Sequence, residues 1–201
     1  MLLRELQEIA DADKVRQDCA EWFNVCPTEK MYHGTEDYTA PVSILKLKAK
    51  RKPSGSSIRM HDAVNDFFEE KFGWRAREAG LFCTGHAVTG SIYSNKVYPH
   101  IAIPIGKFEY LWSAEIPDMY GIYTGFMGSR AGNFPKYDDT AARRIDSEDA
   151  TIEKVKNAKW HFNEGIVPAL KLDVEIIVKA DSFYLIRPES DLAEQLYGKY
   201  K

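Results

Sequence analysis

Apolar residues recur at intervals of three and four in two parts of the chain, a spacing typical of amphipathic helices. In the first part, charged residues separate the apolar ones, which are Leu2, Leu3, Leu6, Ile9 and Val15. The pattern predicts one or two helices over residues 2–23. Pro27 ends them, so we expect residues 1–27 to form a helical N-terminal extension.

The second periodic stretch lies in the middle of the first half of the chain. Its apolar positions are Met60, Ala63, Val64, Phe67, Phe68 and Phe72. Gly73 follows directly, and glycine is the residue that most often ends a helix. The sequence therefore predicts a helix that stops at Gly73.

Short apolar or alternating runs predict strands and further helices in the rest of the chain. The expected strands are residues 30–33, 42–47, 81–84, 98–103, 174–179 and 183–187. The expected helices are residues 87–93, a segment around residues 152–158 continued by 166–170, and residues 189–201. Helices and strands do not alternate regularly, so we expect an α+β fold in a single domain over residues 1–201.

Two segments have the composition of loops. Residues 46–59 carry lysines and arginines around a run of Pro, Ser and Gly, and residues 121–150 hold glycines and charges with little periodicity. Long irregular segments in compact domains are commonly functional or mobile. We interpret residues 121–150 as a loop that faces a target, and residues 46–59 either as a solvated loop or as a contact to phosphates.

Composition narrows the functional classes. The 201-residue chain has a formal net charge of −3 and a pI near 6.0, so nucleic acid would have to bind at a local basic patch. No apolar run approaches the roughly 20 residues of a membrane span, and the N-terminus lacks the pattern of a signal peptide. Three cysteines without a CxxC pair and scattered histidines indicate neither a disulfide scaffold nor a metal site. We expect a cytoplasmic protein.

The chemistry begins with the run Tyr32-His33-Gly34-Thr35. Gly34 has no Cβ and lets a ligand approach the main chain, while the imidazole of His33 can exchange a hydrogen bond with a ribose hydroxyl. The hydroxyl of Thr35 can support the same contact. The run is therefore a candidate binding site for a nicotinamide nucleotide.

Two later segments follow this run in an order that resembles the ADP-ribosyltransferase superfamily. Residues 80–93, Gly-Leu-Phe-Cys-Thr-Gly-His-Ala-Val-Thr-Gly-Ser-Ile-Tyr, are similar to its second motif, a strand leading into a helix. Residues 172–178, Leu-Asp-Val-Glu-Ile-Ile-Val, with Phe183-Tyr184-Leu185-Ile186 resemble its third motif, an acidic-x-Glu opening a strand that forms a hairpin with the next strand. The resemblance spans residues 30–188.

The superfamily has two branches, and the sequence does not decide between them. In the His-Tyr-Glu branch, which includes poly-ADP-ribose polymerases and diphtheria toxin, Phe82 falls where the first tyrosine stands. Thr84 is closer to the serine or threonine of the Arg-Ser-Glu branch. The small single-domain form is typical of a bacteriophage or toxin-type effector, for which the cytoplasm would be that of the host.

The resemblance implies NAD as cofactor, a fold of mixed sheets around an NAD cleft, and roles for particular residues. Glu175 would stabilise the cation that develops when the nicotinamide–ribose bond breaks, and Asp173, on the same strand face, would orient or deprotonate the acceptor. His33, Gly34 and Thr35 would bind a ribose. The second motif adds four cofactor-binding candidates: Phe82, Thr84, Ser91 and Tyr93, of which Tyr93 would stack on nicotinamide.

The pyrophosphate of NAD requires cations. Four arginines are candidates because guanidinium groups match phosphate oxygens: Arg51, Arg59, Arg75 and Arg77. The sequence does not choose among them, although Arg51 lies in the basic segment.

The leading hypothesis is transfer of ADP-ribose from NAD to a macromolecular acceptor, a protein or a nucleic acid. One alternative is a catalytically silent member of the same fold that binds a nucleotide or a protein partner. Another is a nucleic-acid-binding module that uses the basic segment and stacks bases on Tyr110, Trp112 and Tyr120.

Overall fold

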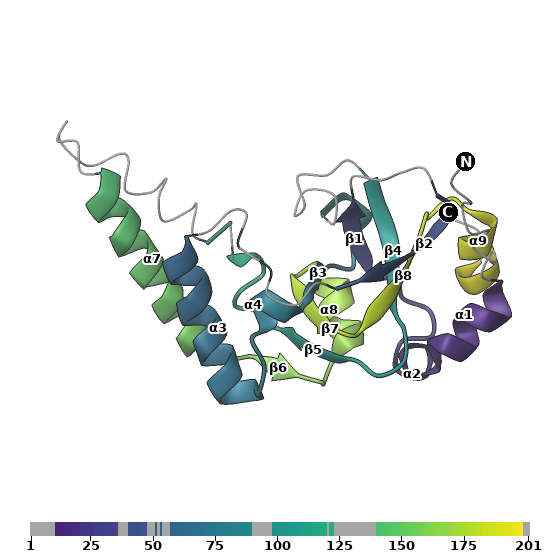
Figure 1. Ribbon diagram of the computed structural model, residues 1–201, viewed down its shortest axis with the longest axis horizontal. Helices are drawn as coiled ribbons and strands as arrows, with labels where there is room; N and C mark the ends of the chain where they lie inside the picture. The colour runs from purple at the N-terminus through teal and green to yellow at the C-terminus, as the bar shows by residue number, and fades with distance from the viewer. Residues whose placement is uncertain are drawn as a thin grey trace, which may run out of the picture. The chain divides into compact units, whose positions relative to one another are not determined.

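The computed structural model describes residues 11–35, 40–47, 51, 53, 57–89, 98–119, 121–122 and 140–198, with the side chains from residue 145 onward in the last range. The fold is α+β, as expected (Figure 1). The chain divides into two compact units, each made of separate segments. The first comprises Met1–Leu47, Cys83–Phe108 and Ala180–Lys201, and the second comprises Lys48–Phe82 and Glu109–Lys179. The single domain expected above stays a prediction.

Helices of the first unit come from both ends of the chain. α1 (Ala12–Asp18) begins at Asp11, whose carboxylate accepts from the N–H of Lys14 at 2.7 Å, and α2 (Ala20–Val25) follows directly. α9 (Asp191–Tyr197) confirms the helix expected near the C-terminus, and it contacts α1. The N-terminal helices are confirmed from residue 12 onward, while residues 1–10 of that prediction lie outside the described residues.

The first unit also contains a four-stranded sheet in the order β1-β4-β8-β2. Its strands are β1 (Tyr32–Thr35), β4 (Tyr98–Pro104), β8 (Ser182–Ile186) and β2 (Val42–Lys46). The three pairings are antiparallel, with Tyr32 opposite Ile101 and Ile103 opposite Tyr184. Apolar residues of β4 and β8 are buried because these are the two central strands.

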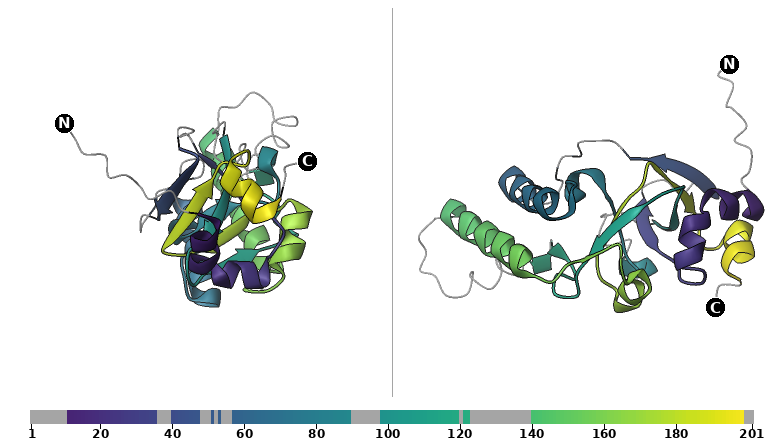
Figure 2. Two further views of the ribbon diagram at one scale, coloured as in Figure 1. Left: turned by 90° about the vertical axis from the view of Figure 1, so that its right-hand side faces the viewer. Right: turned by 90° about the horizontal axis from the view of Figure 1, so that it is seen from below.

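Helices of the second unit include the one predicted to stop at Gly73. α3 (Ile58–Phe72) starts at Ser57, whose hydroxyl accepts from the N–H of Met60, and it ends at Gly73 with φ of 81°. α4 (Ala76–Ala79), α7 (Thr140–Asn157) and α8 (Ile166–Leu172) also belong to this unit. α3 and α7 lie side by side (Figure 2). Within the described ranges, no helix combines the length and the apolar character needed to cross a bilayer.

A second sheet has the order β3-β7-β5-β6, and its residues belong to this unit except for Cys83 at the end of β3. Its strands are β3 (Leu81–Cys83), β7 (Ile176–Lys179), β5 (Glu109–Trp112) and β6 (His161–Phe162). β5 pairs antiparallel with both β6 and β7. Cys83 is buried, as expected of a small apolar residue on a strand.

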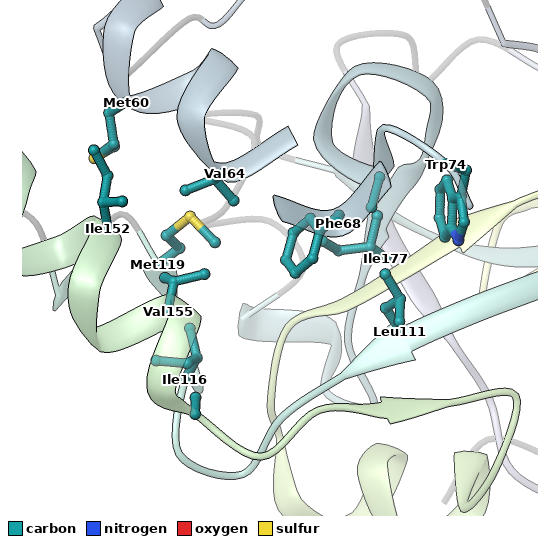
Figure 3. Close-up of a cluster of buried hydrophobic side chains, with 12 residues drawn as sticks. Met60, Val64, Phe68, Trp74, Leu111, Ile116, Met119, Ile152, Val155 and Ile177 are labelled. Atoms are coloured by element: carbon teal, nitrogen blue, oxygen red, sulfur yellow. The ribbon is translucent and has the colours of Figure 1, made fainter. Parts of the chain in front are cut away.

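The hydrophobic core of the second unit lies between α3, α7 and this sheet (Figure 3). Phe68 of α3 is fully buried, and its ring meets Trp160 edge to face at 4.7 Å between centroids. Met60 lies next to Ile152, and Ile177 of β7 joins the same cluster. The apolar stripe of α3 that the sequence predicted is therefore the face that packs the core.

Three predictions about connections are wrong. The strands β7 and β8 do not form a hairpin, because β7 belongs to the second sheet and β8 to the first, with the change of sheet at residues 180–181. Residues 140–150, expected as part of a long loop, are helical in α7, and residues 123–139 lie outside the described residues. Residues 166–170 do not continue that helix, because β6 separates α7 from α8.

The first unit offers a test of its packing at Tyr184. The Tyr184 hydroxyl donates to Asp18 Oδ2 at 2.7 Å, and this bond is the main reason why the pKa of Asp18 is below its ordinary value of 3.8. We expect Tyr184→Phe to lower the free energy of unfolding by about 1 kcal/mol at pH 7. An acid with a lowered pKa contributes stability above its unfolded value, and this contribution disappears as pH falls through the folded value. The difference in the free energy of unfolding between the wild type and Tyr184→Phe, measured with urea, should therefore be smaller at pH 3 than at pH 7. Equal differences at the two pH values would mean that the substitution acts through packing alone.

Candidate functional site

Glu175 lies in the second unit, directly before β7. Its N–H donates to the carbonyl of Pro117 at 2.8 Å, which fixes the main chain at the start of the strand. The side chain is buried, with 7% of the residue exposed, and its Oε1 accepts from Arg77 Nη1 at 3.1 Å. The carboxylate is therefore held in one position by a charged partner, rather than standing on the surface.

The helix α4 carries Arg77 and is fixed on both sides. The Asn65 side chain, fully buried on α3, accepts from the N–H groups of Arg77 and Glu78 at 2.9 and 3.2 Å. At the other end of α4, a Cβ on Gly80 would come within 2.4 Å of Ile177 Cγ2, so only glycine lets the helix approach β7 this closely. These contacts bring Arg77 and Glu175 together although 98 residues separate them.

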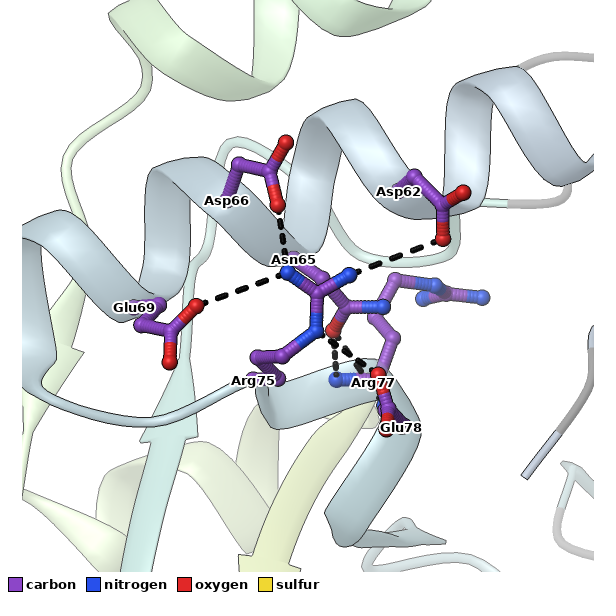
Figure 4. A network of polar contacts seen from close by, with 7 residues as sticks. All are labelled: Asp62, Asn65, Asp66, Glu69, Arg75, Arg77 and Glu78. Atoms are coloured by element: carbon purple, nitrogen blue, oxygen red, sulfur yellow. Dashed lines mark hydrogen bonds and ion pairs between the residues drawn. The ribbon is translucent and has the colours of Figure 1, made fainter. Parts of the chain in front are cut away.

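Arg75, two residues earlier, serves a different purpose. Its guanidinium contacts four carboxylates, those of Asp62, Asp66, Glu69 and Glu78 (Figure 4). The hydrogen bonds to Glu78 and Asp66 are the main causes of a pKa raised above the ordinary value for arginine. The side chain of Arg77 points away from this network (Figure 4). Arg75 therefore anchors α4 to α3, while Arg77 is directed to Glu175.

The ring of Phe82 on β3 contacts two guanidinium groups. The guanidinium carbon of Arg77 lies 4.7 Å from the centroid of the Phe82 ring, and that of Arg51 lies 4.8 Å from the same centroid. The N–H of Arg51 also donates to the carbonyl of Glu78 at 3.3 Å, which ties this residue to α4. Two of the predicted cofactor-binding residues, Arg51 and Phe82, thus share one site with Glu175.

The surroundings of Glu175 shift its pKa in opposite directions. Burial raises the pKa of Glu175 above its ordinary value of 4.5, because the charged form loses its hydration. The charges of Arg77 and Arg51 lower the pKa, and the charge of Asp118 raises it. The result is a carboxyl group whose ionised form depends on the two arginines.

His61 is a residue that the sequence interpretation missed. It lies on α3, is buried with 6% exposed, and has a pKa lowered by burial first and by the charge of Arg77 second. Burial and the nearby charge of Arg77 therefore favour the neutral form of its imidazole. A polar residue within an apolar helical stripe was the only signal for it in the sequence.

The first unit holds the run that opens the predicted nucleotide site. His33, Gly34 and Thr35 lie on β1, and His33 is paired directly opposite His100 of β4. The Thr35 hydroxyl lies 3.4 Å from His100 Nδ1, a hydrogen bond that holds this end of β1. Since residues opposite each other on paired strands share a sheet face, the two imidazoles lie on the same side of the sheet.

The remaining predicted site residues have mixed outcomes. Thr84 is buried and pairs with Tyr32 through two backbone hydrogen bonds of 2.7 and 3.0 Å. Ser91 and Tyr93 lie outside the described residues. Asp173 is not on a strand, because it ends α8 in the left-handed conformation with φ of 54°. The expectation that it shares a strand face with Glu175 is therefore wrong.

The aromatic residues proposed for base stacking are also reassigned. Tyr110 and Trp112 are buried in β5, with 7% and 5% exposed, and the Trp112 indole N–H donates to the carbonyl of Glu164 at 2.8 Å. Trp112 stacks on His161 within the protein. Neither ring is available to a base, and Tyr120 lies outside the described residues.

The described contacts make Glu175, Arg77, Arg51 and Phe82 the candidate site: one buried carboxylate and two guanidinium groups around an aromatic ring. A carboxylate of this kind can stabilise positive charge, and guanidinium groups can bind phosphate. Comparisons with protein-family models, with curated proteins and with solved structures found no match.

Proposed function

We propose that the protein is an NAD-dependent ADP-ribosyltransferase that breaks the nicotinamide–ribose bond and transfers ADP-ribose to a macromolecular acceptor. The observation that carries the proposal is the Glu175 carboxylate, buried at the start of β7 and hydrogen-bonded by Arg77 at 3.1 Å. Electrostatic stabilisation is strongest where the stabilising group is fixed and water is excluded. Glu175 satisfies both conditions.

In the proposed reaction, nicotinamide leaves with the electron pair of the bond to ribose C1′, and positive charge develops on the sugar. Glu175 binds the ribose 2′-hydroxyl and stabilises that charge. A nucleophilic atom of the acceptor then forms the bond to C1′ and gives its proton to a base, a role assigned to Asp173. Asp173 is half-buried and directly precedes the segment that carries Glu175.

The other site residues bind NAD in this proposal. His33, Gly34 and Thr35 bind a ribose, Thr84 supports β1 through its bridge to Tyr32, and Tyr93 with Ser91 receives the nicotinamide. Arg51 and Phe82 belong to the cofactor site beside Glu175. The acceptor is a protein or a nucleic acid.

A second candidate function is favoured by the same ion pair. Arg77 compensates the charge of Glu175 in the protein as described, and a compensated carboxylate stabilises a cation less well. A catalytically silent member of the fold would bind a nucleotide or a protein partner without turnover. In such a protein, Arg77 would stay paired with Glu175 at all times.

Incubation with NAD separates the two functions. We expect the protein to release nicotinamide from NAD labelled in the nicotinamide ring. With NAD labelled in the adenine ring, we expect it to transfer labelled ADP-ribose to protein or nucleic acid in a cell extract. Mass spectrometry of the labelled molecules then identifies the acceptor. Binding of NAD without release of nicotinamide, in extract as well as in buffer, would contradict the transferase and favour the silent member.

A further inference from the structure

The strand β2 lies at one edge of the first sheet. The order β1-β4-β8-β2 gives it β8 as its one neighbour among the described strands. In an edge strand, every second residue turns its N–H and carbonyl away from the sheet. Such groups form hydrogen bonds with water or with a strand of another chain. The pairing of β2 with β8 decides which residues these are.

Alternate residues of β2 make the hydrogen bonds to β8. The N–H of Arg187 donates to the carbonyl of Pro41 at 3.0 Å, and these two residues continue the register of the two strands. Because hydrogen-bonded and non-hydrogen-bonded pairs alternate along antiparallel strands, Ser43 and Leu45 also bond to β8. Among the described residues, none forms a hydrogen bond with the main chain of the outward residues of β2. These outward residues are Val42, Ile44 and Lys46.

The three outward residues are arranged symmetrically about Ile44. When a second copy of β2 runs antiparallel with Ile44 opposite its own counterpart, Val42 of each chain is opposite Lys46 of the other. Each of the three pairs can then exchange both of its N–H···O bonds, so every outward group of the strand has a partner. A second copy of this chain therefore fits the whole edge.

The side chains of β2 suit the same arrangement. Ile44 is 49% exposed, and contact with its counterpart would remove apolar surface from water. Lys46 would face Val42, so like charges would not lie directly opposite each other. The two copies of Lys46 would be four residues apart along the strands, about 14 Å, which exceeds the Debye length of about 10 Å at 0.1 M salt.

We propose that β2 pairs antiparallel with β2 of a second copy of this chain and joins the two first sheets into one across a twofold axis at Ile44. Both copies contribute the same residues, as in other twofold dimers. A standard interface takes roughly 20–30 residues from each side, whereas β2 supplies five. We therefore expect a weak dimer with a dissociation constant between about 1 μM and 1 mM. The dimer does not depend on the proposed transferase activity.

Sedimentation equilibrium of the full chain over this concentration range measures the association. We expect the average mass of the wild type to rise from that of the monomer toward twice that value. Ile44→Lys places two positive charges opposite each other at the axis and should keep the protein monomeric. Val25→Lys is the matched control, because Val25 on α2 is also 49% exposed, and it should associate like the wild type. Thermal unfolding shows whether both variants are folded.

Disulfide formation in air tests the register. In the proposed pair, Ile44→Cys brings two thiols opposite each other with Cα atoms about 5.5 Å apart, within the range of a disulfide. The two copies of a Ser43→Cys variant would be diagonal neighbours at roughly 7–8 Å, which is too far. We therefore expect a cross-linked dimer from Ile44→Cys alone. The three native cysteines are buried: Cys19, Cys26 and Cys83.

Three results would overturn the proposal. The first is a wild type that stays monomeric up to about 1 mM, the upper end of the expected range. The second is a dimer that Ile44→Lys and Val25→Lys weaken equally. The third is cross-linking of Ser43→Cys as readily as Ile44→Cys, because the two copies would then meet in another register or on another surface.

Discussion

Replacing Glu175 by glutamine should slow the release of nicotinamide from NAD on the order of 10²–10³-fold, the usual effect of removing a fixed electrostatic stabiliser. The amide keeps the shape of the side chain and can still accept a hydrogen bond from Arg77. It removes the negative charge, which the cationic transition state needs more than the bound substrate does. The effect should therefore appear in kcat, while NAD binding is retained.

Steady-state kinetics and direct titration with NAD measure the two effects separately. Glu164→Gln is a suitable control, because this substitution makes the same chemical change outside the site. The Glu164 side chain is 72% exposed. The control should match the wild type in both measurements. If Glu175→Gln lost binding and turnover in equal proportion, the carboxylate would be a structural group.

The second large effect concerns stability. Arg77→Met should lower the free energy of unfolding by about 3–5 kcal/mol at pH 7, because it leaves the buried charge of Glu175 without its partner. The double variant Arg77→Met with Glu175→Leu should recover most of this loss, since apolar residues of similar size can replace a buried pair. Urea unfolding of the wild type, the two single variants and the double variant gives the coupling energy.

The pH dependence of Arg77→Met follows from Glu175. A carboxyl whose folded pKa is raised contributes stability that is complete below the unfolded value of 4.5 and is lost as pH rises through the folded pKa. Removing Arg77 takes away a charge that lowers this pKa, so the folded value rises further. The destabilisation should be smaller at pH 5 than at pH 7. An equal loss at both pH values, with no recovery in the double variant, would mean that Arg77 acts through packing alone.

The sequence predicted those elements whose local pattern is strong. α3 followed from apolar spacing and from Gly73, whose left-handed φ of 81° suits the end of a helix. β4 and β2 followed from short apolar runs between loop residues. Residues 140–150 were missed as part of α7 because the segment is rich in charge, and its helix depends on packing against α3.

Partners in space were harder to predict than elements. β7 and β8 are separated by two residues, a spacing typical of a hairpin, yet the chain changes sheets there, and only the pairing of β7 with β5 decides this. Asp173 was placed on a strand because the acidic-x-Glu pattern alternates, but the left-handed residue at the end of α8 interrupts the alternation.

The candidate site was predicted in part. Glu175, Arg51 and Phe82 were chosen from the sequence, and the structure adds Arg77 as the direct partner of Glu175. The four arginines have the same chemistry, and only their neighbours distinguish them: within the described part of the chain, four carboxylates surround Arg75 and one lies beside Arg77. Such neighbours come from α3 and β7, which are far apart in the sequence.

Glu175 is proposed to act on the ribose of NAD, and a structure with a non-hydrolysable NAD analogue bound is the direct test. The measured quantity is the distance from the Glu175 carboxylate to the 2′-oxygen of the nicotinamide ribose. We expect a charge-assisted hydrogen bond of about 2.5–2.7 Å between these two groups. An analogue bound with its ribose beyond hydrogen-bond distance of Glu175, and with the 3.1 Å contact between Arg77 and Glu175 unchanged, would contradict this role of Glu175.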